Sequence, residues 1–484
     1  MKKKKILSFL LAGVMIGQTV PIGTMIVSAE EKSMVGEEQL SDKKTAAPEK
    51  DKAVPNSSQY KYQKDELAAF CHFGPNTFTG KEWGDNYGDT DPNQLFTLKE
   101  NFDAETLVKT IKEAGFKKLI ITAKHHDGFC LWNSEYTTYD VASTDYAKKN
   151  YDNMGGDILA EISAACTKED IDMGLYLSPW DIHEPSYGNN SPGDYNEFYN
   201  NQLKEILGNN KYGNGGKFVE IWMDGAKGGG ADPQDYTIDK WYETITKYEG
   251  EECLIFGAGP YASVRWIGNE NGEAADETWS KSILTEDNKI KNDPSQREDD
   301  FKGDPTDHFS NGYAEGNKWT VPEVDARITS GWFWGNGKST PKSMEQLANM
   351  YFSSVGRNAP LLLNIPPNNK GTVDDAILNR VKEFGNAVKE TFTNNIAAGK
   401  NVSCTASEVR GNDIAYSPNN VLDGNQDTYW TTDDKTEATE ATLEVNLGET
   451  KQFDVVSIEE AIKFGQRISE FKVEYKNGSD EWKV

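Results

Sequence analysis

Acidic side chains follow several short apolar runs in this sequence. The sharpest case is FVEIWMDG at 218–225, which places Asp224 at the end of a run that reads as a buried strand. In parallel α/β barrels, side chains at the carboxyl ends of the strands carry the chemistry. Asp224 is therefore the first candidate for a catalytic carboxylate, although an Asp before Gly can also simply shape a turn.

A second acid is needed if Asp224 is catalytic, because one isolated carboxylate cannot both attack a substrate and donate a proton. The segment RWIGNE at 265–270 supplies Glu270, 46 positions after Asp224 (270 − 224). It lies in the loop after the apolar run 254–257 or at the tip of a following strand. Glu273 and Glu277 lie close by and compete for the same role.

The adjacent pair His125 and His126 follows another apolar run. Adjacent residues of a strand point to opposite faces, whereas metal ligands on one face need i and i+2 spacing. No further His or Cys cluster accompanies the pair, since His183 and His308 stand alone. Neutral imidazoles and carboxylates together can bind several hydroxyl groups. Hydroxyl recognition is therefore favoured over a metal site, and structural packing stays the alternative.

Six tryptophans fall at or beyond the ends of the apolar runs. They are Trp83, Trp132, Trp180, Trp222, Trp332 and Trp334. Tryptophan in such a fold usually fills the core, but a core does not gather so many at one rim. A pyranose ring presents an apolar face that stacks on an aromatic side chain, so the pattern indicates a sugar site.

The elements that must position these residues alternate between two kinds. Apolar runs of strand length occur at 67–73, 118–123, 173–178, 218–225, 254–257, 324–328 and 361–365. Helical spacing of apolar residues occurs between several of them, at 104–114, 158–167, 195–207 and 344–355. This alternation predicts a mostly parallel sheet. No glycine-rich phosphate loop follows the first run, so an irregular (β/α)8-like TIM barrel is favoured over a doubly wound sheet.

The first residues resemble an export signal. Residues 1–29 carry four lysines, an apolar stretch and a small-residue cleavage site, which is the form of a signal peptide, with a membrane anchor as the alternative. Residues 30–58 are polar and read as a flexible linker. We therefore predict a secreted or cell-surface protein with no membrane insertion after cleavage. The formal charge of −27 disfavours nucleic acid and anionic membranes as partners.

The spacing of apolar residues changes near 393–400, where short stretches that alternate between apolar and polar residues replace helical spacing. We expect a catalytic barrel over 59–394 and a C-terminal β-sandwich over 395–484. The five cysteines are widely spaced without a CxxC pair, and most are interpreted as buried apolar residues.

Taken together, the motifs resemble glycoside hydrolase family 29, the retaining α-L-fucosidases. The resemblance covers about residues 60–394 and rests on blocks in the family's order. These are HFG at 72–74, NTF at 76–78, EWG at 82–84, AKHHDGF at 123–129, GLY at 174–176, IWMDG at 221–225 and LLLN at 361–364.

The resemblance implies roles for individual residues. The family's nucleophile matches Asp224, and RWIGNE is similar to the branch that prefers α-1,3/1,4-linked fucose, which favours Glu270 as the general acid/base. The fucose-binding residues match His72, Glu82, Trp83, His125, His126, Trp132, Tyr176 and Trp332, and Trp222 beside the nucleophile is added to them. No cofactor is implied for catalysis.

The tail resembles the discoidin-like sandwich of the family, which is similar to carbohydrate-binding modules. The supporting motifs are NIAAGK at 395–400, VLDG at 421–424, TYW at 428–430 and FGQR at 464–467. The sequence stops before the closing strands of that pattern, so the sandwich is expected to be incomplete. Such sandwiches sometimes hold structural calcium, for which Asp423 and Asp427 are candidates.

These observations predict a secreted, retaining exo-α-L-fucosidase that removes terminal α-1,3/1,4-linked L-fucose from oligosaccharides or glycoconjugates. Three alternatives stay open. They are a broad-specificity α-L-fucosidase, a non-catalytic fucose-binding lectin or adhesin, and a metal-dependent hydrolase or isomerase that uses His125 and His126.

Overall fold

The computed structural model describes residues 34–149, 156–226, 232–257, 259–291, 311–335, 339–434, 440–476 and 482–484. The chain divides into two compact units. One is Pro55–Lys389, and the other combines Met1–Val54 with Glu390–Val484. The predicted signal peptide at 1–29 lies outside the described residues. Within the described ranges, we find no helix whose length and apolar character would let it cross a membrane.

The larger unit contains a closed barrel of parallel strands, as predicted. Its strands follow the order β1-β10-β9-β6-β5-β4-β3-β2. They are β1 (Leu67–Cys71), β2 (Lys118–Lys124), β3 (Asp172–Leu177), β4 (Glu220–Trp222), β5 (Leu254–Phe256), β6 (Val264–Trp266), β9 (Val321–Arg327) and β10 (Leu361–Asn364). Seven of these match the apolar runs. The eighth, β6, has only three residues and was too short to show a period.

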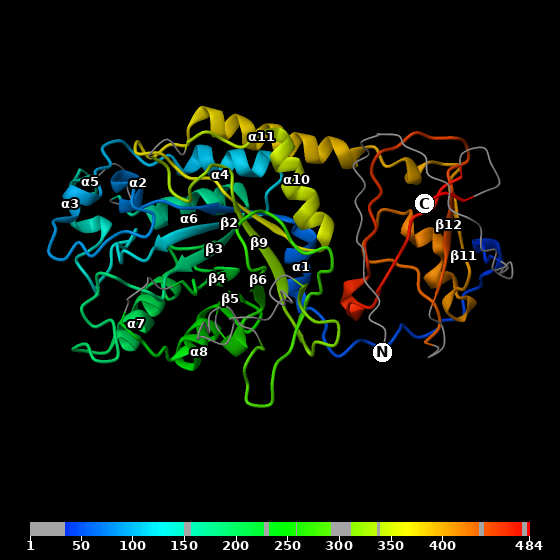
Figure 1. The fold of residues 1–484 in the computed structure, drawn as a ribbon, viewed down its shortest axis with the longest axis horizontal. Helices are drawn as coiled ribbons and strands as arrows, with labels where there is room; N and C mark the ends of the chain where they lie inside the picture. The colour runs from blue at the N-terminus through cyan, green and yellow to red at the C-terminus, as the bar shows by residue number, and fades with distance from the viewer. Residues whose placement is uncertain are drawn as a thin grey trace, which may run out of the picture. The chain divides into compact units, whose positions relative to one another are not determined.

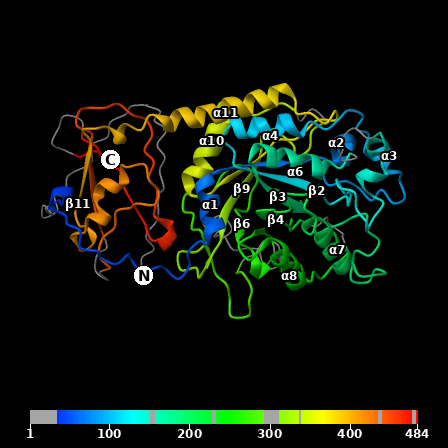
Figure 2. The same ribbon diagram turned by 180° about the vertical axis from the view of Figure 1, so that it is seen from behind.

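Helices surround the barrel (Figure 1). They are α1 (Ser57–Asp65), α2 (Pro75–Thr79), α3 (Pro92–Leu95), α4 (Ala104–Glu113), α5 (Asp145–Lys148), α6 (Ile158–Glu169), α7 (Tyr195–Leu207), α8 (Ile238–Glu249), α10 (Met344–Ser354) and α11 (Asp375–Thr393). Three of the longer ones begin after an aspartate, Asp103, Asp157 or Asp194. Each of these carboxylates accepts a hydrogen bond from a backbone N–H three residues on, which satisfies one free donor of the first turn. Figures 1 and 2 both show α4 beside α6, and α7 beside α8.

Two connections depart from the regular strand-helix alternation. In the described residues between β5 and β6, the only regular element is the 3-10 helix Gly259–Tyr261. Between β6 and β9 the chain forms an antiparallel pair, β7 (Lys281–Ser282) with β8 (Lys318–Trp319). Glu270 lies in this second connection, which explains why no simple strand-end pattern located it.

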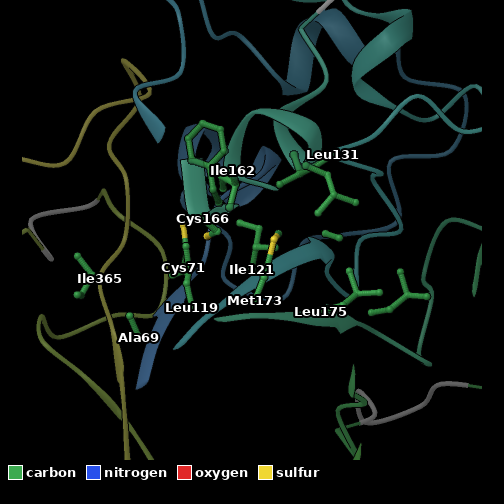
Figure 3. Close-up of a cluster of buried hydrophobic side chains, with 14 of the residues drawn as sticks. Ala69, Cys71, Leu119, Ile121, Leu131, Ile162, Cys166, Met173, Leu175 and Ile365 are labelled. Atoms are coloured by element: carbon green, nitrogen blue, oxygen red, sulfur yellow. The ribbon is translucent and has the colours of Figure 1, made fainter. Parts of the chain in front are cut away.

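The main core lies between the barrel strands and the helices outside them. Figure 3 shows Cys71 of β1, Ile121 of β2 and Met173 of β3 packed with Ile162 and Cys166 of α6. All five cysteines are free thiols, four of them buried and Cys253 partly so. Here the thiols pack as small apolar side chains, in line with the sequence interpretation.

The second unit has little regular structure in its described residues. It contains the antiparallel strands β11 (Ser403–Ala406) and β12 (Leu443–Asn446). The alternating stretches 455–459 and 471–475 form no regular strand, apart from a single bridge between Tyr475 and Lys483. Short 3-10 helices are Glu37–Gln39, Ile396–Ala398, Arg410–Asn412, Ile414–Tyr416, Pro418–Val421 and Ile462–Phe464, in addition to Val141–Ser143 and Val355–Arg357 in the barrel unit.

The segment before the barrel is packed, although its composition suggests a tether. Val35 forms an antiparallel bridge with Ala406 of β11. The Arg410 guanidinium donates to the carbonyl of Ala46 at 2.7 Å, and the Tyr416 hydroxyl donates to the carbonyl of Thr45 at 2.9 Å. Residues 34–54 therefore belong to the C-terminal unit, and Val35 and Leu40 also pack against its small apolar cluster of Ala406, Val409 and Tyr416.

Candidate active site

The ends of four neighbouring strands gather most of the predicted site residues. His72 follows β1, His125 and His126 follow β2, Tyr176 lies near the end of β3, and Asp224 follows β4. These strands are adjacent and parallel, so their carboxyl ends meet at one edge of the barrel. Ring centroids of His72, His125 and Tyr176 lie within 6.0 Å of one another, and the His126 ring lies 4.2 Å from that of His125. We call these four residues the histidine cluster.

Asp224 is held by donors on both carboxylate oxygens. The Tyr176 hydroxyl donates to Oδ2 at 2.9 Å, and the backbone N–H of Ala226 donates to Oδ1 at 2.8 Å. His126 Nε2 lies 3.6 Å from the same Oδ2. The Asp224 side chain is 24% exposed, in contrast to the buried histidines around it. It is therefore both fixed in orientation and open to a ligand.

The three histidines are neutral, because burial disfavours their charged form. Burial lowers the pKa of His72 to about 3, and it lowers the pKa of His125 well below its usual value. Burial also lowers the pKa of His126, against an opposing effect of the Asp224 and Asp181 carboxylates. Neutral imidazoles offer one donor and one acceptor each, which suits hydroxyl groups.

The hydrogen bonds of His126 define its tautomer. The Ser178 hydroxyl donates to the carbonyl of Trp180 at 2.6 Å, so its hydrogen is not available to His126. His126 Nδ1, 2.7 Å from the Ser178 oxygen, must therefore carry the ring hydrogen. Nε2 then carries no hydrogen and lies beside the Asp224 carboxylate. The His126 Nε2 and the Asp224 Oδ2 can therefore both accept hydrogen bonds from ligand hydroxyls.

His125 contains a buried polar atom without a partner. Its Nδ1 has no hydrogen bond among the described residues. The ring is stacked on Tyr176 with centroids 5.6 Å apart and planes 8° apart. Leaving a buried polar atom unpaired is costly, so a bound polar group is the natural occupant here.

Glu270 is held through one carboxylate oxygen. The Trp332 indole N–H donates to Oε2 at 3.1 Å, and Arg327 Nη2 lies 3.5 Å from the same atom. The Arg327 guanidinium also lies over the Trp332 ring, 5.3 Å from its centroid. Both contacts use Oε2, so Oε1 is the oxygen that faces no protein donor in the described part of the chain.

The two competing glutamates have other partners. Glu273 pairs with Arg357 at 3.3 Å, and Glu277 accepts from the Trp279 indole at 3.0 Å. The contact with Trp332 connects Glu270 alone of the three to the histidine cluster, since the Trp332 ring lies 4.9 Å from His72.

Glu82 and Trp83 lie on the segment after α2. Glu82 accepts from the backbone N–H of Trp332 at 3.2 Å, which places its carboxylate beside the cluster. Trp83 is 47% exposed and lies edge-on to His126, with centroids 6.0 Å apart. An exposed indole at this rim can stack on a sugar ring.

Two of the predicted aromatic residues lie deeper than a ligand-binding role requires. Trp132 is fully buried, and its indole donates to Glu205 at 2.7 Å, so the structure places it in the core and outside the histidine cluster. Trp222 lies inside the barrel, stacked on Phe256 at 3.9 Å and on Tyr176 at 5.2 Å. Its indole donates to Glu323 Oε1 at 2.9 Å, so Trp222 supports Tyr176 from within the barrel.

Buried acids on β9 lie inside the barrel, below the site. Glu323 and Asp325 are both buried, and Asp325 accepts from the Trp266 indole at 2.8 Å. Burial raises the pKa of Glu323 to about 7 and raises that of Asp325 well above its usual value. The buried Lys118–Glu220 pair lies close to Glu323, so the interior charges partly compensate one another.

Three residues that contact the predicted site have no role in the sequence prediction. Asn364 contacts His72, Ser178 contacts His126, and Arg327 contacts Glu270. Each lies at or just after the end of a barrel strand, which is the signal that could have identified it. Their types are common in turns and on surfaces, so position alone did not distinguish them.

Metal-binding groups do not gather in the parts of the chain that the structure describes. No three His, Cys, Asp or Glu side chains there are arranged to hold a metal ion. At the calcium candidates, Asp423 accepts from Asn425 N–H and from the Thr428 hydroxyl. These contacts shape a turn, and the described residues do not confirm the predicted calcium site at Asp423 and Asp427.

The arrangement suits hydrolysis of a glycosidic bond. Two carboxylates follow different strands of one barrel, β4 and β6. Asp224 accepts a hydrogen bond from Tyr176, and Glu270 accepts one from Trp332, which lies beside His72. Glycoside hydrolases act with such a carboxylate pair, one as nucleophile or base and one as acid.

Comparisons with known proteins agree with this chemistry. The family model described as Alpha-L-fucosidase matches residues 33–391, and the model described as F5/8 type C domain matches residues 403–484. Alpha-L-fucosidase 1 of Arabidopsis thaliana is 38% identical over 431 residues, which cover 89% of this chain and 78% of the relative.

Solved structures of similar proteins include bacterial fucosidases. A Ruminococcus gnavus fucosidase in complex with fucose is 55% identical, with a TM-score of 0.85, and the match covers 93% of this chain and 90% of that one. A putative α-L-fucosidase from Bacteroides thetaiotaomicron is 30% identical, with a TM-score of 0.73, over 90% of this chain and 88% of that one.

Proposed function

Since this chain belongs to the α-L-fucosidase family of glycoside hydrolases, we propose that it is a secreted, retaining exo-α-L-fucosidase. Its substrates in this proposal are oligosaccharides or glycoconjugates with a terminal α-1,3- or α-1,4-linked L-fucose. The observation that carries the proposal is the pair Asp224 and Glu270. Asp224 accepts a hydrogen bond from Tyr176 of the histidine cluster, and Glu270 accepts one from Trp332, whose ring lies 4.9 Å from His72.

In the proposed reaction, Asp224 attacks the anomeric carbon of fucose and Glu270 protonates the leaving glycosidic oxygen. Glu270 then acts as a base and activates water, which releases fucose with retained configuration. The two donors on Glu270 Oε2 support this role, because they leave Oε1 to carry and transfer the proton. The Tyr176 and Ala226 donors hold the Asp224 carboxylate in one orientation during attack.

His72, His125, His126 and Glu82 bind the fucose hydroxyls in this proposal, and Trp83 and Trp332 flank the ring. Their neutral imidazoles and the unpartnered Nδ1 of His125 support it. Hydrogen bonds that strengthen in the transition state accelerate the reaction, whereas those made equally in the ground state only improve binding. The Ruminococcus gnavus enzyme, which was also solved as an aspartate-to-alanine mutant with fucose, is a binder of the same sugar.

The nucleophile is tested with Asp224→Ala. We expect turnover of an aryl fucoside to fall by several orders of magnitude, because no covalent glycosyl intermediate can form without the carboxylate. Added azide can then attack from the vacated face and give the inverted fucosyl azide. Circular dichroism checks that the variant is folded, and near-normal turnover by a folded variant would exclude Asp224 as the nucleophile.

The acid is tested with Glu270→Gln, using Glu277→Gln as the matched control. A general acid matters most for a poor leaving group, so Glu270→Gln should reduce oligosaccharide cleavage far more than cleavage of an activated aryl fucoside. The control should reduce both equally or not at all. If Glu273→Gln gives the asymmetry instead, the acid is Glu273.

Linkage preference is tested by comparing a branched Lewis-type trisaccharide with a linear α-1,2-fucosylated one. The proposal expects a higher kcat/KM for the branched substrate, because contacts beyond the fucose can stabilise the transition state. Equal values would return the enzyme to the broad-specificity class. Binding of fucose without turnover of any fucoside would instead indicate a lectin, and loss of activity on chelation would indicate a metal-dependent enzyme.

A further inference from the structure

Asn364 occupies the end of strand β10, where it links two groups of the candidate site. Its side chain is fully buried. Nδ2 donates to the backbone carbonyl of Trp332 at 2.7 Å, and Oδ1 lies 2.8 Å from His72 Nδ1. In the barrel, Asn364 pairs in register with Phe70 of β1, two residues before His72. The short distance between these strands brings the amide to the histidine ring.

The chemistry of the Trp332 carbonyl fixes the orientation of the Asn364 amide. A carbonyl oxygen can only accept, so the amide must present its NH2 group to Trp332. The amide oxygen then faces His72, and an oxygen of this kind cannot donate. The ring hydrogen of His72 must therefore be on Nδ1.

The protonation state of the other ring nitrogen of His72, Nε2, follows from this assignment. Burial keeps the His72 ring neutral at ordinary pH, so it carries a single hydrogen, and Nε2 has a free lone pair. Free neutral imidazole in water is not held to this tautomer, and a hydrogen bond to the other nitrogen decides which form is present.

We propose that Asn364 is a positioning residue that holds His72 in the Nδ1–H tautomer, so that Nε2 accepts a hydrogen bond from one hydroxyl of the bound sugar. This inference rests on the proposed function of His72 in fucose binding. A hydroxyl that donates to Nε2 is distinguished from a hydrogen or an ether oxygen at the same carbon, since neither can donate. Asn364 thus contributes to sugar specificity without contacting the sugar.

The same amide stabilises the other side of the site. By binding the carbonyl of Trp332, Asn364 also holds Trp332 in place. The backbone N–H of Trp332 donates to Glu82, and its indole N–H donates to Glu270. A general loss of activity in an Asn364 variant would therefore not identify the tautomer role, and the test must detect the hydroxyl that His72 binds.

The first test measures kcat/KM of an aryl α-L-fucoside and of its 2-, 3- and 4-deoxy analogues. Wild type is compared with Asn364→Leu, and Asn200→Leu is the matched control. Asn200 is a buried asparagine on α7 whose amide bonds Thr244, away from the site. The quantity of interest is the loss in kcat/KM that each missing hydroxyl causes in each enzyme.

We expect one deoxy analogue to lose about tenfold less in Asn364→Leu than in wild type, because the released His72 no longer presents a fixed acceptor to that hydroxyl. The other two losses should be unchanged, and Asn200→Leu should show all three losses of wild type. If all three deoxy losses are the same in Asn364→Leu and in wild type, the tautomer role is refuted.

The second test uses the unaltered protein and does not depend on a variant that folds. Nitrogen-15 NMR of the histidine-labelled enzyme distinguishes the two tautomers of a neutral ring, and the five histidines of the chain keep the spectrum simple. His72→Gln identifies the His72 signals. We expect the Nδ1–H form at neutral pH, and finding the Nε2–H form would overturn the proposal. If no fucoside were cleaved at all, the proposed function would fail while this spectrum still decided the tautomer.

Discussion

Asp127 allows a quantitative test of how burial controls charge next to the candidate site. It follows His125 and His126 directly and is 1% exposed. Oδ1 accepts from the Phe129 N–H at 2.9 Å, whereas Oδ2 has no hydrogen-bond partner among the described residues. Burial raises the pKa of Asp127 from 3.8 to about 7. The substitution Asp127→Asn tests this pKa, because asparagine has nearly the shape of the neutral aspartic acid side chain but cannot ionise.

The direction in which the free energy of unfolding changes with pH follows from proton uptake by Asp127 on folding. Between pH 3.8 and about 7 the unfolded chain carries an ionised Asp127 while the folded protein keeps it protonated, so the free energy of unfolding falls as pH rises through this window. Below the window the contribution of Asp127 is fully present, and above it the loss is complete. A shift of about 3 units at about 1.4 kcal/mol each amounts to about 4 kcal/mol.

The contribution of Asp127 to the free energy of unfolding can be measured between pH 5 and pH 8. About 2 units of the window fall there, which corresponds to about 3 kcal/mol. The barrel unit, residues 55–389, has 335 residues (389 − 54). At about 2.1 cal/mol/K per residue its unfolding entropy is about 0.7 kcal/mol/K, so Asp127 accounts for a fall in Tm of about 4 °C from pH 5 to pH 8.

The assay is thermal unfolding of wild type, Asp127→Asn and the control Asp89→Asn at both pH values. Asp89 is an exposed carboxyl in the same unit. The difference in Tm between pH 5 and pH 8 should be about 4 °C smaller in Asp127→Asn than in wild type, and Asp89→Asn should match wild type. An unchanged difference in Asp127→Asn would show that Asp127 is already ionised in the folded protein at pH 5, against the raised pKa.

Three further predictions concern the site and the two units. Tyr176→Phe should lower kcat/KM by about 10- to 100-fold, because it removes a hydrogen bond to the Asp224 carboxylate worth about 1.5–3 kcal/mol. The control Tyr199→Phe removes an equally buried hydroxyl outside the site and should leave kcat/KM near wild type. A shortened chain of residues 55–389 should fold, by circular dichroism, and retain aryl-fucosidase activity, and a folded but inactive product would place part of the chemistry outside the barrel unit. Arg410→Met should make residues 34–54 more sensitive to protease than in wild type, since Arg410 bonds the carbonyl of Ala46, and unchanged cleavage would show that other contacts hold the segment.

The sequence determined the barrel and the type of its site. Seven apolar runs of strand length alternated with helical spacing, and buried parallel strands require such continuous runs. Polar residues at their ends, among them His72, His126 and Asp224, then had to meet at one edge, because parallel strands share a direction. The positions of these residues followed from local pattern alone.

The tertiary structure decided what local pattern could not. Strand β6 is three residues long and pairs with β5 and β9, so the location of Glu270 depended on partners that no local pattern shows. Trp132 and Trp83 look alike in sequence, yet one is buried against Glu205 and the other is 47% exposed. Residues 34–54 have the composition of a tether and are held by Arg410 and Tyr416, more than 360 positions away.

The tautomer of His72 shows the same division most sharply. The sequence places a histidine after β1 and an asparagine at the end of β10, almost 300 residues later. Only closure of the barrel brings the two strands side by side, so that the Trp332 carbonyl orients the amide and the amide orients the ring. Sequence determined which groups reach the rim, because strand direction is a local property. Tertiary structure decided which of their atoms face a ligand, because hydrogen-bond direction depends on partners that are far apart in the chain.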